Sequence, residues 1–296
     1  VHGGGDGAGD ALARLLRRSC RAAAAAGAPR RLQKALIELA DIRYAWPDAP
    51  PVLDGVSLGV REGEKLVLLG ANGSGKSTLL KLMNGLVAPQ AGRFSYCGEA
   101  VTPARLKDGA FARRFRSEVV LLFQHPEAML FNPTVRDEVA YGPRQLGLAD
   151  AGARAERWMT ALDLIQLADK APFALSGGQK QKVALAAILA LEPRVLLLDE
   201  PAASLDPRAA GWLVDYLLDC GKTVVTSTHN LSMASELGER AVVLGEGGRP
   251  LFDGPLHDAL RDHALLEAAN LMHRHRHRHD GVEHAHTHSH DWESSR

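Results

Sequence analysis

The residues from Gly70 to Ser77 are of the types that surround the phosphates of a nucleotide. They read Gly-Ala-Asn-Gly-Ser-Gly-Lys-Ser and match the pattern G-x-x-x-x-G-K-[ST]. Glycines allow backbone conformations in which successive N–H groups curl around phosphate oxygens, and a following helix adds partial positive charge. We expect Lys76 to reach the β- and γ-phosphates and the Ser77 hydroxyl to bind Mg²⁺.

Two adjacent acids later in the chain could complete this chemistry. Asp199 and Glu200 follow the apolar run 195–198, at the carboxyl end of a predicted strand, where parallel-sheet folds bind their ligands. We expect Asp199 to hold Mg²⁺, directly or through water, and Glu200 to be the general base that deprotonates an attacking water. Together with the phosphate loop, this pair predicts nucleotide hydrolysis.

The elements that must position these residues can be read from short apolar runs. Such runs are typical of strands buried on both faces, and several alternate with helical stretches. The expected strands are 66–69, 119–123, 195–198, 224–226 and 241–244, and the expected helices include 76–85, 179–191 and 209–218. The pattern predicts an α/β fold in which helices cover a largely parallel sheet.

Composition excludes several classes of protein. Among 296 residues, 35 Lys and Arg stand against 35 Asp and Glu, so the chain lacks the basic surface that binds nucleic acid. No run approaches the roughly 20 apolar residues that a membrane span needs. Cys20, Cys97 and Cys220 are isolated and odd in number, which argues against a disulfide framework and a structural zinc site and favours a reducing compartment.

The segment Leu175–Gln179, which reads Leu-Ser-Gly-Gly-Gln, narrows the family. Placed between the phosphate loop and the Asp-Glu strand, it closely resembles the signature of ATP-binding cassette (ABC) ATPases, and the resemblance covers residues 35–260. It implies a P-loop ATPase domain at residues 35–271. Such a domain has a RecA-like core, an antiparallel β-subdomain and a helical signature subdomain, here at about 125–190.

The resemblance also implies roles for single residues. Trp46 matches the aromatic residue that stacks on adenine, and Gln124 the Q-loop glutamine that binds Mg²⁺ together with Ser77 and Asp199. The expected catalytic residues are Glu200, the switch histidine His229, Lys76 and Gln124. The remaining contacts to ATP from the same chain are expected from Asn72, Gly73, Ser74, Gly75, Lys76, Ser77 and Thr78. The residues that would face the ATP of a partner are Ser176, Gly177, Gly178, Gln179 and the D-loop residue Asp206.

ABC ATPase domains face each other head to tail, with ATP between the phosphate loop of one and the signature of the other. Because this chain holds one set of motifs, the partner must be a second copy or a related subunit. ATP would close the dimer and hydrolysis would open it, and the segment after Gln124 would pass this motion to a membrane protein. These expectations place the chain at the cytoplasmic face of the cell membrane.

A narrower resemblance concerns residues 123–135 and 139–143, which look like the ATPases of energy-coupling factor importers. There, this loop docks a transmembrane scaffold subunit that works with a substrate-binding membrane subunit, and one branch carries cobalt and nickel. Ala128, Met129 and Lys182 depart from the usual residues. We expect a cobalt or nickel importer ATPase. The alternatives are an ATPase for a vitamin or another solute, an efflux system, a soluble ABC ATPase acting on ribosomes or DNA, and a metal-storage protein with a degenerate cassette.

Both ends of the chain differ from this domain. Residues 1–34, rich in Gly, Ala and Arg, are expected to be a disordered extension or translation from an early start rather than an export signal. An organellar targeting peptide is the alternative, against which Asp6 and Asp10 count. Eight of the 13 histidines fall in the low-complexity segment 272–296, which is expected to be disordered. Imidazole suits Ni²⁺ and Co²⁺. Three arginines at 274–278 interrupt the first histidine cluster, so the predicted metal ligands are His284, His286, His288 and His290. A purification tag and a solvated tail with incidental affinity are the alternatives.

Overall fold

The computed structural model describes residues 35–279 and 282–289, which form two compact units. The helical unit comprises residues 113–196 and 201–223, and the sheet unit comprises residues 35–112, 197–200 and those from 224 onward. The extension at 1–34 lies outside the described residues. Within the described ranges, no helix combines the length and the apolar character needed to cross a bilayer.

The sheet unit is built on the strands that the apolar runs predicted. β3 pairs in parallel with β8 on one side and with β9 on the other, and β10 is antiparallel to β9. The strand order is β10-β9-β3-β8, followed by the end of β7 from residue 197. The bounds are β3 Lys65–Leu69, β7 Val195–Asp199, β8 Thr223–Thr228, β9 Arg240–Leu244 and β10 Pro250–Pro255. The apolar residues of β3 are buried, as expected for a strand that is covered on both faces.

Helix α2 (Lys76–Met83) starts at the end of the phosphate loop and stops where the sequence predicted. Its cap residue is Asn84, and the next residue, Gly85, has φ 73°, a left-handed conformation that glycine adopts without strain. The other helices of the sheet unit are α8 Leu231–Leu237, α9 Leu256–Arg261 and α10 His263–Ala268, with short 3₁₀ turns η1 Arg105–Lys107 and η5 Glu246–Gly248.

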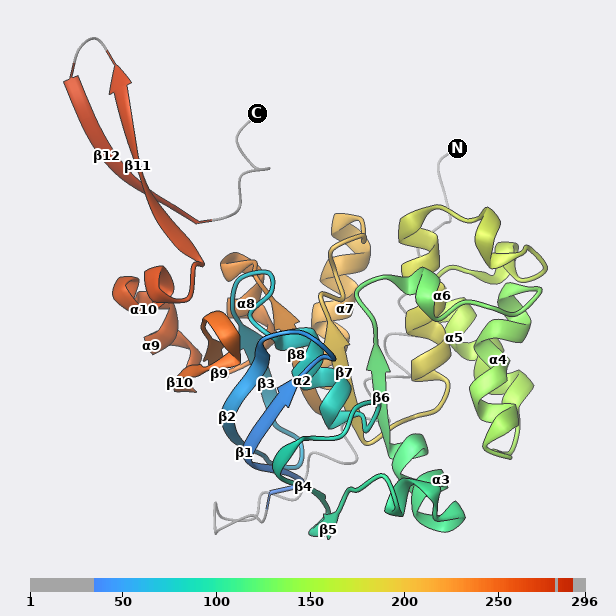
Figure 1. Cartoon of the computed structure of the whole chain (residues 1–296). Coiled ribbons are helices and arrows are strands. Elements are labelled where there is room, and N and C mark those ends of the chain that lie inside the picture. The colour runs from blue at the N-terminus through green and yellow to red at the C-terminus, as the bar shows by residue number, and fades with distance from the viewer. Residues whose placement is uncertain (1–34, 280–281, 290–296) are drawn as a thin grey trace, which may run out of the picture. The chain divides into compact units, whose positions relative to one another are not determined.

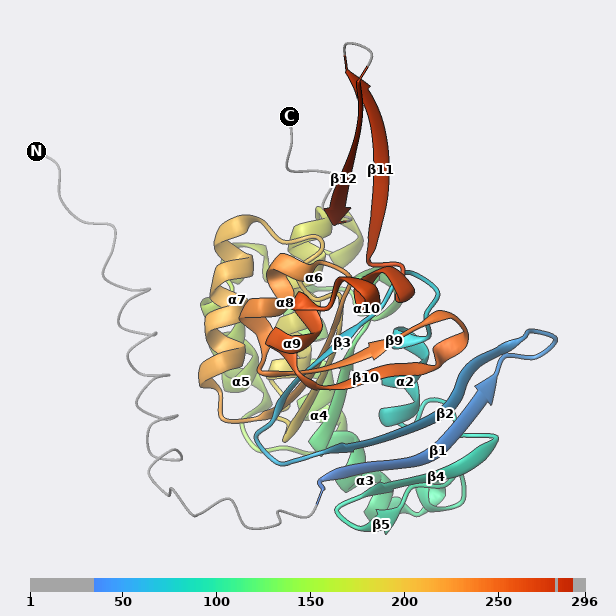
Figure 2. The same ribbon diagram turned by 90° about the vertical axis from the view of Figure 1, so that its left-hand side faces the viewer.

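A four-stranded antiparallel sheet in the same unit confirms the expected β-subdomain (Figure 2). Its order is β2-β1-β4-β5, with bounds β1 Ile37–Ala45, β2 Pro51–Val60, β4 Ala91–Tyr96 and β5 Glu99–Ala100. The register of β1 against β4 shifts between Ala40 and Arg43, where Asp41 has φ 49°. A Cβ at Gly92 would lie 2.3 Å from the Asp41 carbonyl oxygen, so this bulge requires glycine on the neighbouring strand.

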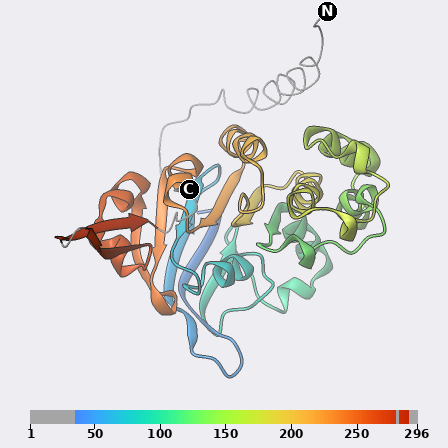
Figure 3. The same ribbon diagram turned by 90° about the horizontal axis from the view of Figure 1, so that it is seen from above.

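Helices dominate the helical unit, in which α4, α5 and α6 pack against one another (Figures 1 and 3). The elements are β6 Val119–Leu122, α4 Val135–Gln145, α5 Ala151–Ala161, α6 Gly177–Leu189 and α7 Pro207–Asp219, with 3₁₀ turns η2 Pro126–Ala128, η3 Ile165–Leu167 and η4 Pro172–Ala174; α3 Gly109–Glu118 precedes β6. The hydroxyl of Thr134 caps α4 by accepting the Asp137 N–H. Helices α6 and α7 lie where amphipathic stretches predicted them.

The segment after residue 271, for which disorder stays a prediction, is described at 272–279 and 282–289. It contains two antiparallel strands, β11 (Met272–His279) and β12 (Val282–Ser289). The register pairs three histidines of β11 with three of β12: His273 with His288, His275 with His286, and His277 with His284.

Candidate nucleotide site

The phosphate loop has the backbone conformation for which its glycines were predicted. Gly70, Gly73 and Gly75 have φ values of 154°, 83° and 95°. A Cβ would lie 2.6 Å from the Leu244 carbonyl oxygen at Gly70 and 2.5 Å from the Val52 carbonyl oxygen at Gly75. At Gly73 a Cβ would meet nothing within 4 Å. The loop is therefore held tightly at both ends, with open space at its middle.

The loop also offers a hydroxyl donor that fits a phosphate. Helix α2 begins at Lys76, and its cap residue Gly75 makes no side-chain capping hydrogen bond to the first turn. The Oγ atom of Ser74 is buried and has no hydrogen-bond partner among the described residues. Because buried polar atoms are normally paired, this orphaned hydroxyl at a helix N-terminus suits an anionic ligand. The donor set thus fits a nucleotide phosphate.

The Lys76 ammonium is buried within the loop. It donates to the carbonyl oxygens of Gly70, at 2.6 Å, and Ala71, at 3.0 Å. Burial lowers its pKa, and the negative charges of Glu200 and Asp199 partly oppose that shift. The structure therefore brings the predicted lysine and both predicted acids into electrostatic contact.

The two acids lie at the end of β7, as predicted, and both are buried. Asp199 Oδ1 accepts a hydrogen bond of 2.5 Å from the Ser227 hydroxyl. The Glu200 N–H donates to the Ser227 carbonyl oxygen at 3.2 Å. Glu200 Oε1 lies 2.7 Å from Nδ1 of His229, whose side chain is 41% exposed. The predicted base and the predicted switch histidine are thus direct partners.

The backbone of Glu200 is strained. Its φ is 48°, a left-handed conformation that non-glycine residues adopt rarely, and the following residue is Pro201, which further disfavours it. Strain of this kind costs about 1–3 kcal/mol and persists where surrounding contacts enforce it. In this conformation the Glu200 side chain lies against His229.

Trp46 follows the end of β1 and is 38% exposed. Its ring makes a T-shaped contact with Tyr44, with 5.1 Å between centroids, and Lys81 Nζ of α2 lies 5.7 Å from the ring centroid. The predicted adenine-stacking residue therefore lies beside the helix that the phosphate loop opens. An exposed aromatic face at this position is suited to stacking.

Asn72, Ser77 and Thr78 belong to the sheet unit with the rest of the phosphate loop, whereas the predicted Q-loop, signature and D-loop residues belong to the helical unit. Gln124 is exposed and follows β6. Ser176 and Gln179 form a reciprocal capping box at the start of α6, so Gly177 and Gly178 occupy the first helical turn. A Cβ at Gly178 would lie 2.8 Å from the Ser204 carbonyl oxygen. The structure thus brings the signature segment against the D-loop.

The D-loop acid has two stabilising partners. Asp206 caps α7 by accepting the Ala209 N–H at 2.9 Å, and its Oδ2 lies 3.3 Å from Nζ of Lys182 on α6. The Ala209 hydrogen bond and then the Lys182 ammonium lower the pKa of this carboxyl. Lys182 departs from the frequent arginine, yet it keeps the positive charge beside Asp206.

Sequence reasoning missed two residues of this arrangement. Ser227 makes hydrogen bonds to the Asp199 carboxylate and to the Glu200 N–H. Gln181, two residues after the signature, is buried, and its amide donates to the Pro201 carbonyl oxygen at 2.9 Å. Ser227 precedes the Thr-His pair at the end of a predicted strand, which is the signal that could have found it. Gln181 carries no such signal, because its partner is far away in sequence.

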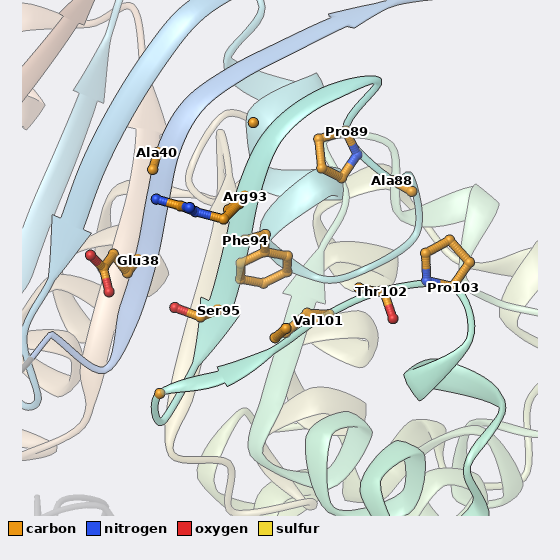
Figure 4. A pocket seen from close by; sticks show the side chains of 13 residues that line it. Glu38, Ala40, Ala88, Pro89, Arg93, Phe94, Ser95, Val101, Thr102 and Pro103 are labelled. Atoms are coloured by element: carbon orange, nitrogen blue, oxygen red, sulfur yellow. The ribbon is translucent and has the colours of Figure 1, made fainter.

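A cavity of about 480 Å³ lies elsewhere in the sheet unit, along β1, β4 and β5 (Figure 4). Phe94 and Arg93 of β4 line it together with Glu38 of β1 and Thr102. None of the predicted nucleotide residues is part of its lining.

Among the residues whose side chains the structure describes, no group of three or more His, Cys, Asp or Glu could hold a metal ion. His290 lies outside the described residues, and the structure describes only the backbone of the other predicted tail ligands.

The chain is similar in sequence to known proteins. The family model described as ABC transporter matches residues 53–203. The nickel import ATP-binding protein NikO of Rhodobacter capsulatus is 42% identical over 243 residues, which cover 79% of this chain and 95% of that protein. The energy-coupling factor transporter ATP-binding protein EcfA of Methanothermobacter thermautotrophicus is 38% identical over 242 residues, covering 80% and 76%.

Two solved structures extend the comparison. CbiO1 of Clostridium perfringens, described as part of the ABC transporter complex CbiONQ, superimposes with a TM-score of 0.66 at 27% identity and covers 81% of this chain and 96% of that chain. A dimeric ATP-binding cassette in a post-hydrolysis state with ADP and Pi has a TM-score of 0.65 at 27% identity and covers 74% and 98%. These similarities, together with the phosphate loop and the acid–histidine pair, identify the chain as an ATP-hydrolysing member of the ABC transporter ATP-binding family.

Proposed function

We propose that this chain powers the import of nickel or cobalt ions as the ATPase subunit of an energy-coupling factor type transporter, bound to the cytoplasmic face of the membrane. The observation that carries the choice of cargo is the 42% identity to a nickel import ATPase over nearly its whole length. Similarity to EcfA and to a member of the CbiONQ complex supports the transporter type.

In this proposal the phosphate loop binds ATP through its backbone N–H groups and the Ser74 hydroxyl. Asn72, Gly73, Gly75 and Thr78 complete the loop contacts, and the Lys76 ammonium exchanges its carbonyl partners for phosphate oxygens. Ser77, Gln124 and Asp199 hold Mg²⁺, which neutralises charge on the phosphates. The orphaned Ser74 hydroxyl and the buried ammonium support these roles.

Glu200 is the proposed general base. Its carboxylate orients a water molecule for attack on the γ-phosphoryl group and accepts the proton, so the products are ADP and inorganic phosphate. The His229 ring, 2.7 Å away, fixes the carboxylate orientation. The His229 side chain is 41% exposed, and we assign its remaining ring edge to the γ-phosphate.

Two such chains, or this chain and a related subunit, complete the site as a head-to-tail dimer. Ser176, Gly177, Gly178, Gln179 and Asp206 then contact the ATP that the partner holds, and Trp46 stacks on the adenine in cis. The close approach of Gly178 to the D-loop supports these contacts to the partner's ATP, because it places the signature segment and the D-loop next to each other. The dimeric state of the related cassette supports the pairing.

A small aromatic surface on the helical unit is suited to the membrane subunits. Phe131 is 66% exposed and Tyr141 38%, and their rings meet in a T-shaped contact at 4.8 Å. The buried Glu138 carboxylate holds this loop by accepting the N–H groups of Phe131, at 2.8 Å, and Asn132, at 2.7 Å. A rigid loop that exposes a large apolar ring is typical of a docking site. We assign it to the transmembrane scaffold subunit, which in turn contacts the substrate-binding subunit.

The histidine-rich segment is the proposed metal-binding tail. Its ligands are His284, His286, His288 and His290, and its role is to hold the transported Ni²⁺ or Co²⁺ close to the transporter. The backbone register supports a compact site, because it sets His284, His286 and His288 opposite histidines of β11.

Replacing the base tests the hydrolytic mechanism. Glu200→Gln should retain ATP binding, lower turnover by at least about 10³-fold and trap the ATP-bound dimer, because the amide cannot accept the proton. Steady-state phosphate release and size-exclusion chromatography with ATP measure these effects. Undiminished turnover would refute Glu200 as the base.

Ser227 and its neighbour Thr226 form a matched pair. Ser227→Ala removes the hydroxyl that donates to Asp199 and accepts from the Glu200 N–H at 3.2 Å, whereas the Ser227 carbonyl oxygen still accepts from that N–H. The variant should lower kcat about tenfold, since a net hydrogen-bond contribution of about 1.4 kcal/mol is lost. Thr226→Val should change kcat less than about twofold, because the buried Thr226 hydroxyl has no partner among the described residues. Equal effects of the two variants on ATPase activity would contradict the assignment.

The docking surface is tested by Phe131→Ala. Loss of one buried aromatic ring should weaken binding to the membrane subunits by about tenfold or more, while the ATPase activity of the isolated chain stays unchanged. Co-purification from membranes and metal uptake by cells measure the two effects. The control is Ile165→Ala, which removes another exposed apolar side chain, 42% exposed, from the same unit. If both variants co-purify like the native chain, the surface is not the docking site.

Titration with Ni²⁺ tests the tail. At pH 7.5 the full chain should bind Ni²⁺ more tightly than a variant ending at Leu271, and this difference should vanish below about pH 6 as the histidines become protonated. Isothermal titration calorimetry gives both affinities. Alanine at His284, His286, His288 and His290 should match the truncation, whereas equal uptake by the full and shortened chains would exclude a metal-binding tail.

A further inference from the structure

The three residues that follow the signature each contact a different motif segment of the helical unit. Lys180 Nζ lies 3.7 Å from Glu127 Oε1, in the segment after Gln124. Gln181 Nε2 donates to the Pro201 carbonyl oxygen at 2.9 Å, and Lys182 pairs with Asp206 of the D-loop at 3.3 Å. One turn of α6 is therefore connected to the Q-loop segment, to the residue after Glu200 and to the D-loop.

Gln181 differs from its two neighbours because it is buried, with 1% of its surface exposed. A buried amide is costly unless it is paired. Its donor side is used by Pro201, whereas its Oε1 atom has no partner among the described residues. The hydrogen bond to Pro201 therefore offsets part of the free-energy cost of burying the Gln181 amide. An apolar side chain of similar volume could fill the same space without that cost.

Pro201 is the residue through which this bond reaches the base. It follows Glu200 directly, and Glu200 has the strained φ of 48°. On the amino side, the Glu200 N–H is held by the Ser227 carbonyl oxygen. On the carboxyl side of Glu200, the carbonyl oxygen of the following residue, Pro201, accepts the hydrogen bond from Gln181. A strained conformation needs such restraint on both sides, because either free end would let the backbone relax.

We propose that Gln181 is a positioning residue for ATP hydrolysis, which holds the backbone after Glu200 in the conformation that aims the carboxylate at the attacking water. The inference rests on the proposed role of Glu200 as base. Because Gln181 lies on the helix that carries the signature, it also links the motif that faces one ATP to the base that acts on the other. The ion pair between Lys182 and Asp206 connects the same helix to the D-loop.

The test uses Gln181→Met in the full chain. Methionine keeps the volume and removes the donor, so kcat should fall about tenfold while KM for ATP stays within about twofold. In the Glu200→Gln background, Gln181→Met should leave ATP-induced dimerisation unchanged. The control, Arg144→Met, breaks an exposed ion pair to Asp137 of 3.0 Å in the same unit and should leave kcat unchanged. Native kcat in Gln181→Met, or a loss of dimerisation together with kcat, would overturn the proposal.

A second variant separates positioning from packing. In Gln181→Glu, the ionised carboxylate repels the Pro201 carbonyl oxygen, whereas the protonated carboxyl can donate to it. Since burial raises the pKa of a carboxyl group, the kcat deficit relative to the native chain should shrink from pH 8 to pH 6. The deficit of Gln181→Met should stay constant over that range. Parallel pH profiles of the two variants would contradict positioning.

The two hypotheses fail in different ways. If Glu200→Gln keeps full turnover, the proposed base is wrong, whatever Gln181 does. If Glu200→Gln is inactive and Gln181→Met is fully active, only the positioning role is lost.

Discussion

The register of the parallel strands in the sheet unit is the constraint on which the nucleotide site depends. Leu69, the last residue of β3, lies opposite Thr228, the last residue of β8. The phosphate loop and His229 therefore leave the sheet side by side. The end of β7 is fixed to β8 by the hydrogen bond from the Glu200 N–H to Ser227. A slip of one residue would turn every side chain to the opposite face and separate the acids from the loop.

This register concentrates charge in a buried place. One ammonium, of Lys76, and two carboxylates, of Asp199 and Glu200, are each less than 10% exposed. Each charge compensates for the lost hydration of the others, and the Ser227 hydroxyl adds a hydrogen bond to Asp199. Because the Lys76 ammonium bonds to neutral carbonyl oxygens, a phosphate oxygen offers it a stronger, charged partner. The site is thus arranged in advance for an anion.

The sequence predicts those elements of the fold that are determined by residues close together along the chain. Buried strands such as β3 were predicted by continuous apolar runs, and the end of α2 by Gly85. The antiparallel strands were reached only through family resemblance, because the bulge at Asp41 breaks the alternation that marks a half-exposed strand. Ser227 and Gln181 were missed because their importance comes from partners 28 and 20 residues away, which no local pattern encodes. The pairing of β11 with β12 escaped prediction since it is a matter of backbone register.

Specificity and catalysis occupy different parts of the chain. In the proposed mechanism the phosphate loop, the acids and His229 carry out the hydrolysis that every ATPase of the family needs, so their geometry is expected to be independent of the cargo. The loop at Phe131 has no proposed part in hydrolysis, and it exposes an apolar ring instead of burying it. The histidines after residue 272 differ further from the hydrolytic residues, since neutral imidazole is a good ligand for transition metals. The choice of partner and cargo is therefore expected to change with these two segments. Hydrolysis, by the same proposals, is expected to depend on the strand ends and on the turn of α6 that bonds to Pro201.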